Sequence, residues 1–171
     1  RGFTKRGEKD AELLNANTYL GPTTVESGLL KFTHAQSLPE GSSLVIGATG
    51  TADLGGHAFT VPTVEGLGVV TNCNLTVTEG IAMTADEFKV RQGLVVKGRV
   101  TFAEGAKLTV TDPENIPENG RSHTVLAADE IVGEVSFDTS VLPGNPGDWR
   151  FYRSGNAYRL GRNIGITVIV K

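Results

Sequence analysis

Short apolar runs that alternate with threonine recur along the first two thirds of the chain, and they predict β-strands. In several runs every second residue is apolar, which is the pattern of a strand with one buried face. Aromatic residues make up only 6% of the chain, so Val, Leu, Ile and Thr must supply most of the interior. The predicted strands are 29–32, 44–46, 58–61, 67–70, 81–84, 94–96 and 108–111.

Glycine introduces most of these runs, and it makes up 22 of the 171 residues. These glycines recur at a spacing of roughly 13 residues, with one gap close to twice that length. Because glycine adopts positive φ angles at little steric cost, we expect a repeating unit of one tight corner and one short strand. The predicted corners are Gly28, Gly41, Gly55, Gly66, Gly80, Gly93 and Gly105.

A unit of this kind cannot bury its apolar face alone, whereas stacked copies form a continuous interior. We therefore expect an all-β fold, specifically a right-handed parallel β-helix (β-solenoid) with about 20–30 residues in each coil. An antiparallel sandwich is the alternative, because it also has strands at regular spacing. The Asn-Gly and Asp-Gly hairpin turns that would favour the sandwich are absent between these strands.

The pattern divides the chain into β-solenoid repeats over residues 1–112 and a C-terminal segment over residues 113–171. In the second part we expect terminal coils and a capping hairpin, whose strands are 149–153 and 157–160. A cap of this kind would cover the exposed backbone groups at the end of a solenoid. We expect a last apolar strand at 164–170, and we find no comparable capping device near the N-terminus.

Composition and charge exclude several classes of protein. A hydrophobic content of 39% argues against disorder, and no apolar run approaches the roughly 18 residues that a membrane-spanning helix needs, so we expect no membrane insertion by this segment. The formal net charge is −3 and the charges are scattered, which does not indicate a nucleic-acid surface. The single cysteine, Cys73, cannot form an internal disulfide. The chain opens Arg1-Gly2-Phe3, and we expect it to be a processed or excised piece of a longer protein.

The segment 15–30 closely resembles the autotransporter passenger-associated β-strand repeat of bacterial surface proteins. Residues 3–8 look like the opening of that repeat, and the segments 52–57 and 67–72 look like the coils that follow it. The end of the chain, from residue 108 onward, is similar to the closing segment of such proteins. The residues that match the repeat are Asn15, Asn17, Thr18, Tyr19, Gly21, Pro22, Thr23, Thr24, Val25 and Gly28.

The resemblance implies a parallel β-helix on an exported protein, located outside the cell or on the bacterial cell surface, that serves as a stalk or display scaffold. It does not imply catalysis. Two positions depart from the pattern: residues 9–14 stand where the family has a Gly-Thr-Leu strand, and Leu29 stands where it has threonine. The motif residues have a structural role in such a fold, since Asn15 and Asn17 can turn the chain and Gly21-Pro22 forms a corner.

The sequence contains no convincing set of catalytic or metal-binding residues. The histidines at 34, 57 and 123 lie far apart, without the spacing or the Cys and carboxylate partners of a zinc site. There is no Gly-x-Ser-x-Gly motif, no P-loop and no Gly-x-Gly-x-x-Gly motif. We therefore expect no enzyme activity, no cofactor and no metal.

Glutamate recurs just before glycine at Glu40, Glu65, Glu79 and Glu104. If the coils stack in register, these carboxylates could form an acidic stripe; otherwise they solvate the corners and discourage edge pairing. A β-helix polysaccharide lyase or hydrolase would need clustered Asp, Lys or Arg on one face, so we consider it the weakest alternative.

Two further functions are consistent with the sequence. In the first, the chain stacks head to tail with other copies of itself into an extracellular filament, rather than with adjoining repeats of a longer parent chain. In the second, it is an adhesin or glycan-binding module. Adhesion would favour an exposed row of aromatic residues, but core packing explains the aromatic positions better. These positions are Phe3, Tyr19, Phe32, Phe59, Phe88 and Phe102.

Overall fold

The computed structural model describes residues 1–90, 92–117 and 122–162. One α-helix, α1 (Ala85–Val90), and three 3-10 turns (Pro113–Asn115, Thr139–Val141 and Pro146–Asp148) accompany the strands. The strands are β1 (Phe3–Lys5), β2 (Ala11–Leu13), β3 (Thr23–Phe32), β4 (Leu44–Asp53), β5 (Ala58–Gly66), β6 (Val69–Met83), β7 (Leu94–Phe102), β8 (Lys107–Val110), β9 (His123–Val132), β10 (Trp149–Ser154) and β11 (Ala157–Arg162).

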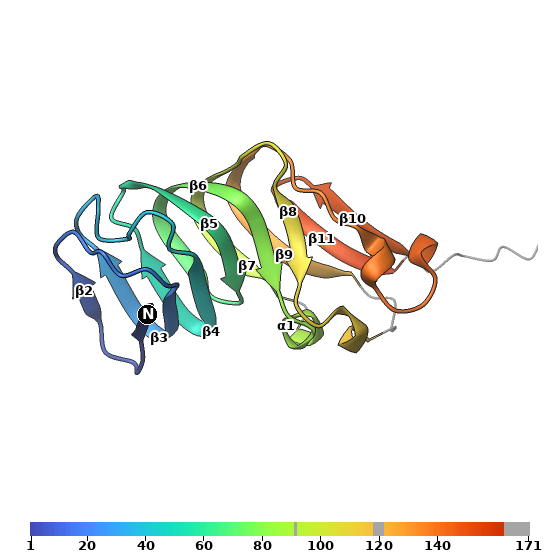
Figure 1. Ribbon diagram of the computed structural model, residues 1–171, viewed down its shortest axis with the longest axis horizontal. Helices are drawn as coiled ribbons and strands as arrows, with labels where there is room; N and C mark the ends of the chain where they lie inside the picture. Colours follow the sequence, from blue (N-terminus) through green and yellow to red (C-terminus); the bar gives the residue numbers. More distant parts are fainter. Residues whose placement is uncertain (91, 118–121, 163–171) are drawn as a thin grey trace, which may run out of the picture.

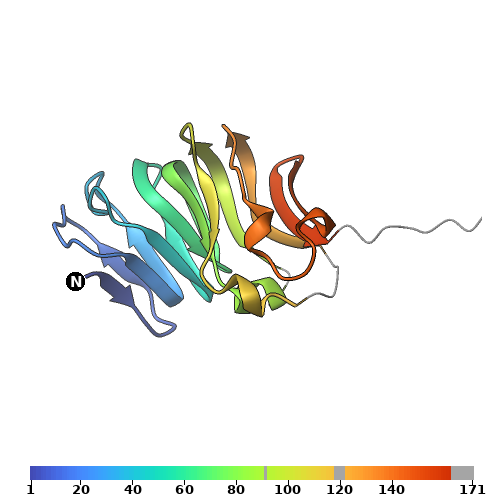
Figure 2. The ribbon, with the colours of Figure 1, turned by 45° about the vertical axis from the view of Figure 1, so that its right-hand side comes forward.

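All of these strands belong to one mixed sheet of 11 strands, and the prediction of an all-β chain is confirmed. From β1 to β9 every pairing is parallel, whereas β11 pairs antiparallel with both β9 and β10. The strands follow one another along the long axis of the molecule, from β2 and β3 near the N-terminus to β10 and β11 at the other end (Figures 1 and 2).

The parallel pairings fall into three rows, which we call rows A, B and C. Within a row, each segment pairs in register with the next segment along the molecule. Row A consists of 3–5, 23–25, 44–46, 64–66, 80–83 and 107–110. Row B consists of 11–13, 27–32, 51–53, 69–71, 94–97 and 126–128. Row C consists of 58–61, 74–77, 99–102 and 130–132.

Most strands pass from one row into another, and we call the stretch of chain from one row-A segment to the next a coil. β6 contributes to all three rows, and its register shifts between Thr71 and Cys73 where it leaves row B. A similar shift lies between Val25 and Ser27 in β3, where the strand passes from row A to row B. Such irregularities bend a strand and increase its twist, so one continuous strand can serve two or three rows.

Each row buries a column of apolar side chains. Leu44, Val64, Ile81 and Leu108 occupy successive paired positions of row A, and all four are buried. Because alternate residues of a strand point to opposite faces, in-register pairing places one interior residue directly above the next. The columns merge into a single apolar cluster that extends into β9 and β11.

Glycine supplies positive φ angles at six of the seven predicted corners. At Gly80, with φ of 136°, an added Cβ atom would overlap the carbonyl oxygen of Lys107 in the neighbouring segment of row A. Gly93 lacks a positive φ, and there an added Cβ atom would overlap the Val125 carbonyl oxygen. The six residues with φ between 61° and 136° are Gly28, Gly41, Gly55, Gly66, Gly80 and Gly105. Gly28, Gly66 and Gly80 lie within strands rather than between them.

An antiparallel hairpin covers the C-terminal end of the described sheet, where the sequence predicts one. β10 and β11 pair from Trp149 and Arg162 to Ser154 and Ala157. Tyr158 of β11 is buried, its ring lies edge-on to Phe102 at 5.8 Å, and its hydroxyl accepts a hydrogen bond from the Val135 amide at 3.0 Å. The hairpin therefore closes the end of the apolar cluster. The predicted strand 164–170 lies outside the described residues.

Helix α1 is not anticipated by the sequence pattern. It lies between the last residue of row A in β6 and the first residue of row B in β7. It buries Phe88, one of the aromatic residues that the sequence assigns to the core. A capping box begins the helix: the Thr84 amide donates to the Glu87 carboxylate at 2.8 Å, and the Glu87 amide donates to the Thr84 hydroxyl at 3.2 Å. The Ser/Thr-x-x-Glu pattern was the available signal.

Candidate functional site

Two loops, residues 14–22 and 33–43, occupy the positions where the first two coils have no row-C strand. The motif that resembles the autotransporter-associated repeat, residues 15–28, lies in the first loop and in the first part of β3. Asn17 joins the loops in the manner of a strand pair: its amide donates to the Gln36 carbonyl oxygen at 3.1 Å, and its Nδ2 donates to the Ser37 carbonyl oxygen at 2.8 Å. Nδ2 also donates to the Asn15 carbonyl oxygen at 3.1 Å, so this side chain sets the shape of both loops.

A chain of hydroxyl groups continues the connection toward row A. Thr23 Oγ1 lies 2.6 Å from the Tyr19 hydroxyl and 2.9 Å from Ser42 Oγ, which in turn donates to the Gly21 carbonyl oxygen at 3.0 Å. Thr23 and Ser42 are fully buried, and burial raises the pKa of the Tyr19 phenol. Because buried hydroxyls are costly unless they are hydrogen-bonded, this network strongly favours one arrangement of the two coils.

The remaining motif residues also serve the backbone and the core. Val25 is fully buried, and Thr24 pairs with both Thr4 and Val45 in row A. The Pro22 carbonyl oxygen accepts a hydrogen bond from the Phe3 amide at 3.0 Å. Gly21 approaches the backbone of Gly2 so closely that a Cβ atom could not be accommodated there. The motif thus connects neighbouring coils, and two of its members, Asn17 and Thr18, also line an open hollow.

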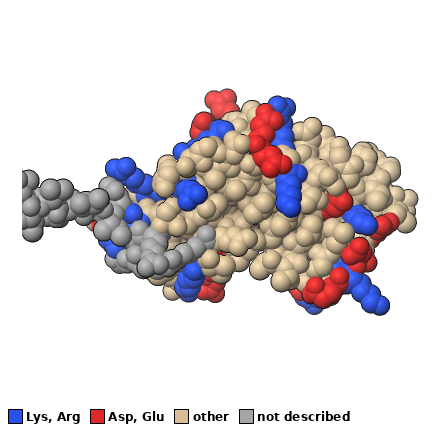
Figure 3. Space-filling view, turned by 180° about the vertical axis from the view of Figure 1, so that it is seen from behind, with Lys and Arg blue, Asp and Glu red and all other residues tan. Residues whose placement is uncertain are grey.

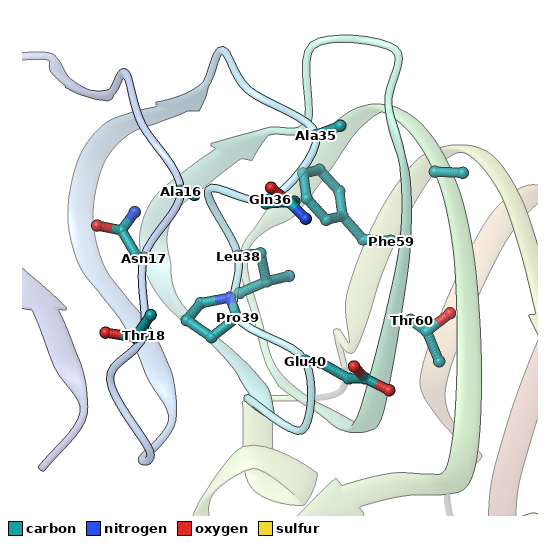
Figure 4. Close-up of a pocket in the computed structure, with 11 residues that line it drawn as sticks. Ala16, Asn17, Thr18, Ala35, Gln36, Leu38, Pro39, Glu40, Phe59 and Thr60 are labelled. Atoms are coloured by element: carbon teal, nitrogen blue, oxygen red, sulfur yellow. The ribbon is translucent and has the colours of Figure 1, made fainter.

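That hollow has a volume of about 510 Å³ and lies between the two loops and the first strand segment of row C (Figure 4). A smaller hollow of about 210 Å³ shares Glu40 and Thr60 with it. The larger hollow is lined by Ala16, Asn17, Thr18, Ala35, Gln36, Leu38, Pro39, Glu40, Ala58, Phe59 and Thr60.

The histidines have three different environments. His34 is exposed, and its Nδ1 accepts a hydrogen bond from the Gln36 amide at 3.1 Å. The His57 ring lies edge-on to the Phe59 ring, with the ring centroids 6.2 Å apart. His123 is 1% exposed and packs against Phe88, with the ring centroids 5.1 Å apart. Burial lowers the pKa of His123 to about 4. Within the described residues, no group of three or more His, Cys, Asp or Glu side chains could hold a metal ion.

The structure does not support an acidic stripe formed by the four recurring glutamates. Glu65 lies inside row A and pairs with Val45 and Ala82. Glu79 instead precedes Gly80, the residue that pairs with Thr63 and Lys107. The regular spacing in the sequence therefore does not carry over into regular stacking, because the coils differ in length. Glu40, Glu79 and Glu104 are exposed, whereas Glu65 is half-buried.

Carboxylates do approach one another around the start of α1. The pKa of Glu87 is raised, first by burial and then by the nearby charges of Glu65 and Asp112. Burial also raises the pKa of Glu65. Glu87 caps the helix, and the Asp112 carboxylate accepts a hydrogen bond from the Ala85 amide at 2.8 Å. Glu87 and Asp112 each accept a backbone amide through one carboxylate oxygen, so both serve the first turn of α1.

Two further side-chain contacts join coils that the sequence alone does not connect. Lys5 is only 5% exposed, and its ammonium group donates to the carbonyl oxygens of Gly7 and Ser27, the latter at 2.7 Å. Arg99 and Glu130, in neighbouring segments of row C, form a two-point ion pair at 2.7 and 2.8 Å. Figure 3 shows Lys and Arg side chains intermingled with Asp and Glu on the face opposite to that of Figure 1.

Comparison with known proteins identifies no relative: no family model, curated protein or solved structure matches this chain. Among the helices that the structure describes, none is long and apolar enough to cross a membrane.

Proposed function

We propose that this chain is a non-catalytic structural segment of an exported bacterial surface protein, built as a right-handed parallel β-helix that serves as a stalk or display scaffold. Rows A, B and C are the three faces of this β-helix, and each passage through the three rows is one coil. The right hand follows from the general preference of parallel β-connections. The bacterial surface location rests on the resemblance of segment 15–30 to autotransporter-associated repeats.

The observation that carries the proposal is the succession of parallel pairings from β1 to β9. Side-chain hydrogen bonds repeat this connection from one coil to the next: Asn17 to Ser37 spans 20 residues, Thr23 to Ser42 spans 19, and Thr63 to Ser43 spans 20. Hydroxyl groups thus hold each coil against the next, as do the glycines and the buried apolar side chains described above. A rigid rod that projects other parts of a protein needs this kind of repeated contact between neighbours.

A proximity experiment tests the stacking. With Cys73 replaced by alanine, cysteines at Thr60 and Thr76 are labelled with pyrene. Because these residues pair directly in row C, we expect strong excimer fluorescence. The matched variant carries labels at Thr60 and Thr71, which are nearer in the sequence but belong to rows C and B, and we expect it to emit as monomer. Excimer emission that is equal in the two variants would contradict the β-helix.

The two ends of the described sheet differ, and this favours a stalk over a head-to-tail filament. β1 and β2 lie at one edge and present parallel segments of rows A and B. At the other end, β10 and β11 form an antiparallel hairpin over row B. An edge of parallel coils fits another parallel coil better than it fits this hairpin, so we assign the β1 and β2 edge to an adjoining coil of a longer chain.

Proline substitutions at this edge test the filament alternative. The Phe3 amide donates to the Pro22 carbonyl oxygen, and the Leu13 carbonyl oxygen accepts from the Thr33 amide. In a parallel pair, alternate residues of an edge strand direct their backbone groups away from the partner strand. The backbone groups of Thr4 and Glu12 therefore face outward. The double variant Thr4→Pro and Glu12→Pro removes both outward donors, and edge strands tolerate proline. We expect the unmodified chain to form no long polymers in sedimentation velocity up to millimolar concentration. Polymers that grow with concentration and disappear in the double variant would contradict the stalk proposal and support the filament alternative.

A further inference from the structure

The larger hollow exists because row C begins only in the third coil. The segment 58–61 pairs with β6 on one side, and on its other side it faces the loops 14–22 and 33–43 instead of a strand (Figure 4). A volume of about 510 Å³ lies within the range of about 300–1,000 Å³ that is typical of small-ligand sites. The hollow is therefore large enough to bind a ligand, whereas elsewhere in row C neighbouring strand segments pair directly.

Both walls of the hollow are held in place before any ligand binds. Asn17 ties the first loop to the second through Gln36 and Ser37. Ser37 is fully buried, and its hydroxyl donates to the His34 carbonyl oxygen at 2.6 Å. Leu38 and Phe59 are buried beneath the hollow, at 4% and 5% exposure. A preformed site loses little conformational entropy when a ligand binds.

The lining combines hydrogen-bond donors and acceptors with a single formal charge. Asn17 donates two side-chain hydrogen bonds through Nδ2, which leaves its Oδ1 to act as an acceptor. Thr18 and Thr60 supply hydroxyls, Gln36 supplies an amide, and Glu40 supplies a carboxylate. In Figure 4 the Glu40 carboxylate extends toward Thr60, and the Gln36 amide lies beside the ring of Phe59. None of the described lining residues is Lys or Arg, so the site suits an uncharged, hydroxyl-rich ligand better than an anionic one.

The smaller hollow extends the site along row C. It shares Glu40 and Thr60 with the larger one and adds Gly41, Pro62 and Thr78. Together the two hollows form a groove with room for more than one compact ring. A linear ligand with hydroxyls at regular intervals matches such an elongated polar surface better than a single small molecule.

We propose that this groove, which we call the row-C groove, binds a neutral polysaccharide chain through Asn17, Gln36, Glu40 and Thr60. The stalk would then hold a glycan at its side, near the boundary between the loops and the first row-C strand. This differs from the aromatic platform considered for adhesion, because Phe59 is buried and supports the groove from below. The inference does not depend on catalysis or on self-assembly, and the scaffold proposal stands if it fails.

Nuclear magnetic resonance titration of the ¹⁵N-labelled chain tests the groove. The probes are cellohexaose, xylohexaose, mannohexaose and laminarihexaose, with hexagalacturonate as the anionic comparison. We expect at least one neutral hexasaccharide to shift the amide signals of residues 17, 36, 40 and 60 in a saturable manner. We expect hexagalacturonate to bind at least tenfold more weakly, because the groove offers a carboxylate and no cation.

Matched variants locate the binding. Glu40→Gln and Thr60→Val are each expected to weaken the affinity roughly tenfold, as befits the loss of a ligand hydrogen bond. Glu79→Gln and Thr101→Val are the controls: Glu79 is exposed near a later corner, and Thr101 lies farther along row C. The controls should bind as the unmodified chain does.

Three results would overturn the proposal: no saturable shift with any of the four neutral probes at millimolar concentration, binding that the groove variants leave unchanged, or hexagalacturonate binding as tightly as the neutral chains. Unfolding curves of each variant accompany the titration, so a loss of binding that merely reflects unfolding is recognised.

Discussion

Replacing Phe32 by alanine is expected to lower the free energy of unfolding by about 3–5 kcal/mol, the usual cost of removing a buried phenylalanine. Phe32 is fully buried at the end of the row-B part of β3. Its ring lies edge-on to Phe59 in the following coil, with centroids 5.8 Å apart. The substitution therefore leaves a cavity between two coils that are otherwise joined by backbone pairing, and pairing holds the backbone too firmly for it to collapse into the space.

Urea denaturation followed by circular dichroism measures this effect. The control is Leu20→Ala, because Leu20 is 92% exposed and its truncation should change stability by no more than about 0.5 kcal/mol. If Phe32→Ala costs less than about 1 kcal/mol, the ring does not occupy the close-packed interior described above. Unfolding in two separate steps would indicate that the coils around Phe32 do not share one cooperative core with the C-terminal hairpin.

Acidification from pH 6.5 to pH 4 is expected to destabilise the chain through His123 by up to about 3 kcal/mol. His123 begins β9, is 1% exposed, and lies against the ring of Phe88 in α1. Its Nδ1 has no hydrogen-bond partner in the described part of the structure. Burial lowers its pKa from 6.5 to about 4, since a charged imidazolium would be poorly solvated there.

The direction of this effect follows from where the proton binds. Between pH 6.5 and pH 4 the unfolded chain gains a proton on His123 and the folded chain does not, so unfolding becomes more favourable as the pH falls. The stability is fully present above pH 6.5 and is lost toward pH 4. Glu65 and Glu87 act in the opposite direction, because their raised pKa values favour protonation in the folded state.

Comparison of the unmodified chain with His123→Leu separates these contributions. The carboxylates are common to both proteins, so the difference between their stability profiles reports His123. We expect the variant to lose less stability between pH 6.5 and pH 4, and we expect Leu20→Ala to keep the full pH dependence. Identical profiles for His123→Leu and the unmodified chain would show that this histidine does not become protonated on unfolding in that range.

Much of the strand pattern could be predicted from the sequence, because the alternation of apolar residues with threonine is a local signal. The runs 44–46 and 94–96 are parts of β4 and β7, and the hairpin of β10 and β11 lies where the aromatic residues and Ser154-Gly155-Asn156 indicate a turn. Positive φ angles at glycines such as Gly41 and Gly105 follow from local corner geometry in the same way.

Other features could not be predicted, because they depend on which segments become neighbours. The acidic stripe required equal coils, but cross-coil hydrogen bonds span 17 residues from Thr78 to Val61 and 31 from Arg99 to Glu130. The buried ammonium group of Lys5 depends on the Ser27 carbonyl oxygen of the next coil. The burial of His123 depends on Phe88, which belongs to a helix inserted between two rows.

The sequence by itself determined much of the strand pattern, several of the corners and the hairpin, since each depends on residues within a few positions of one another. It did not show that the predicted strands 67–70 and 81–84 belong to one long strand, β6. Only the tertiary structure decided the order of pairing, the three rows and the groove. The groove arises because the loops 14–22 and 33–43 lie beside the segment 58–61 without adding strands to row C. No local pattern encodes that juxtaposition, because it results from coils of unequal content stacked on one shared core.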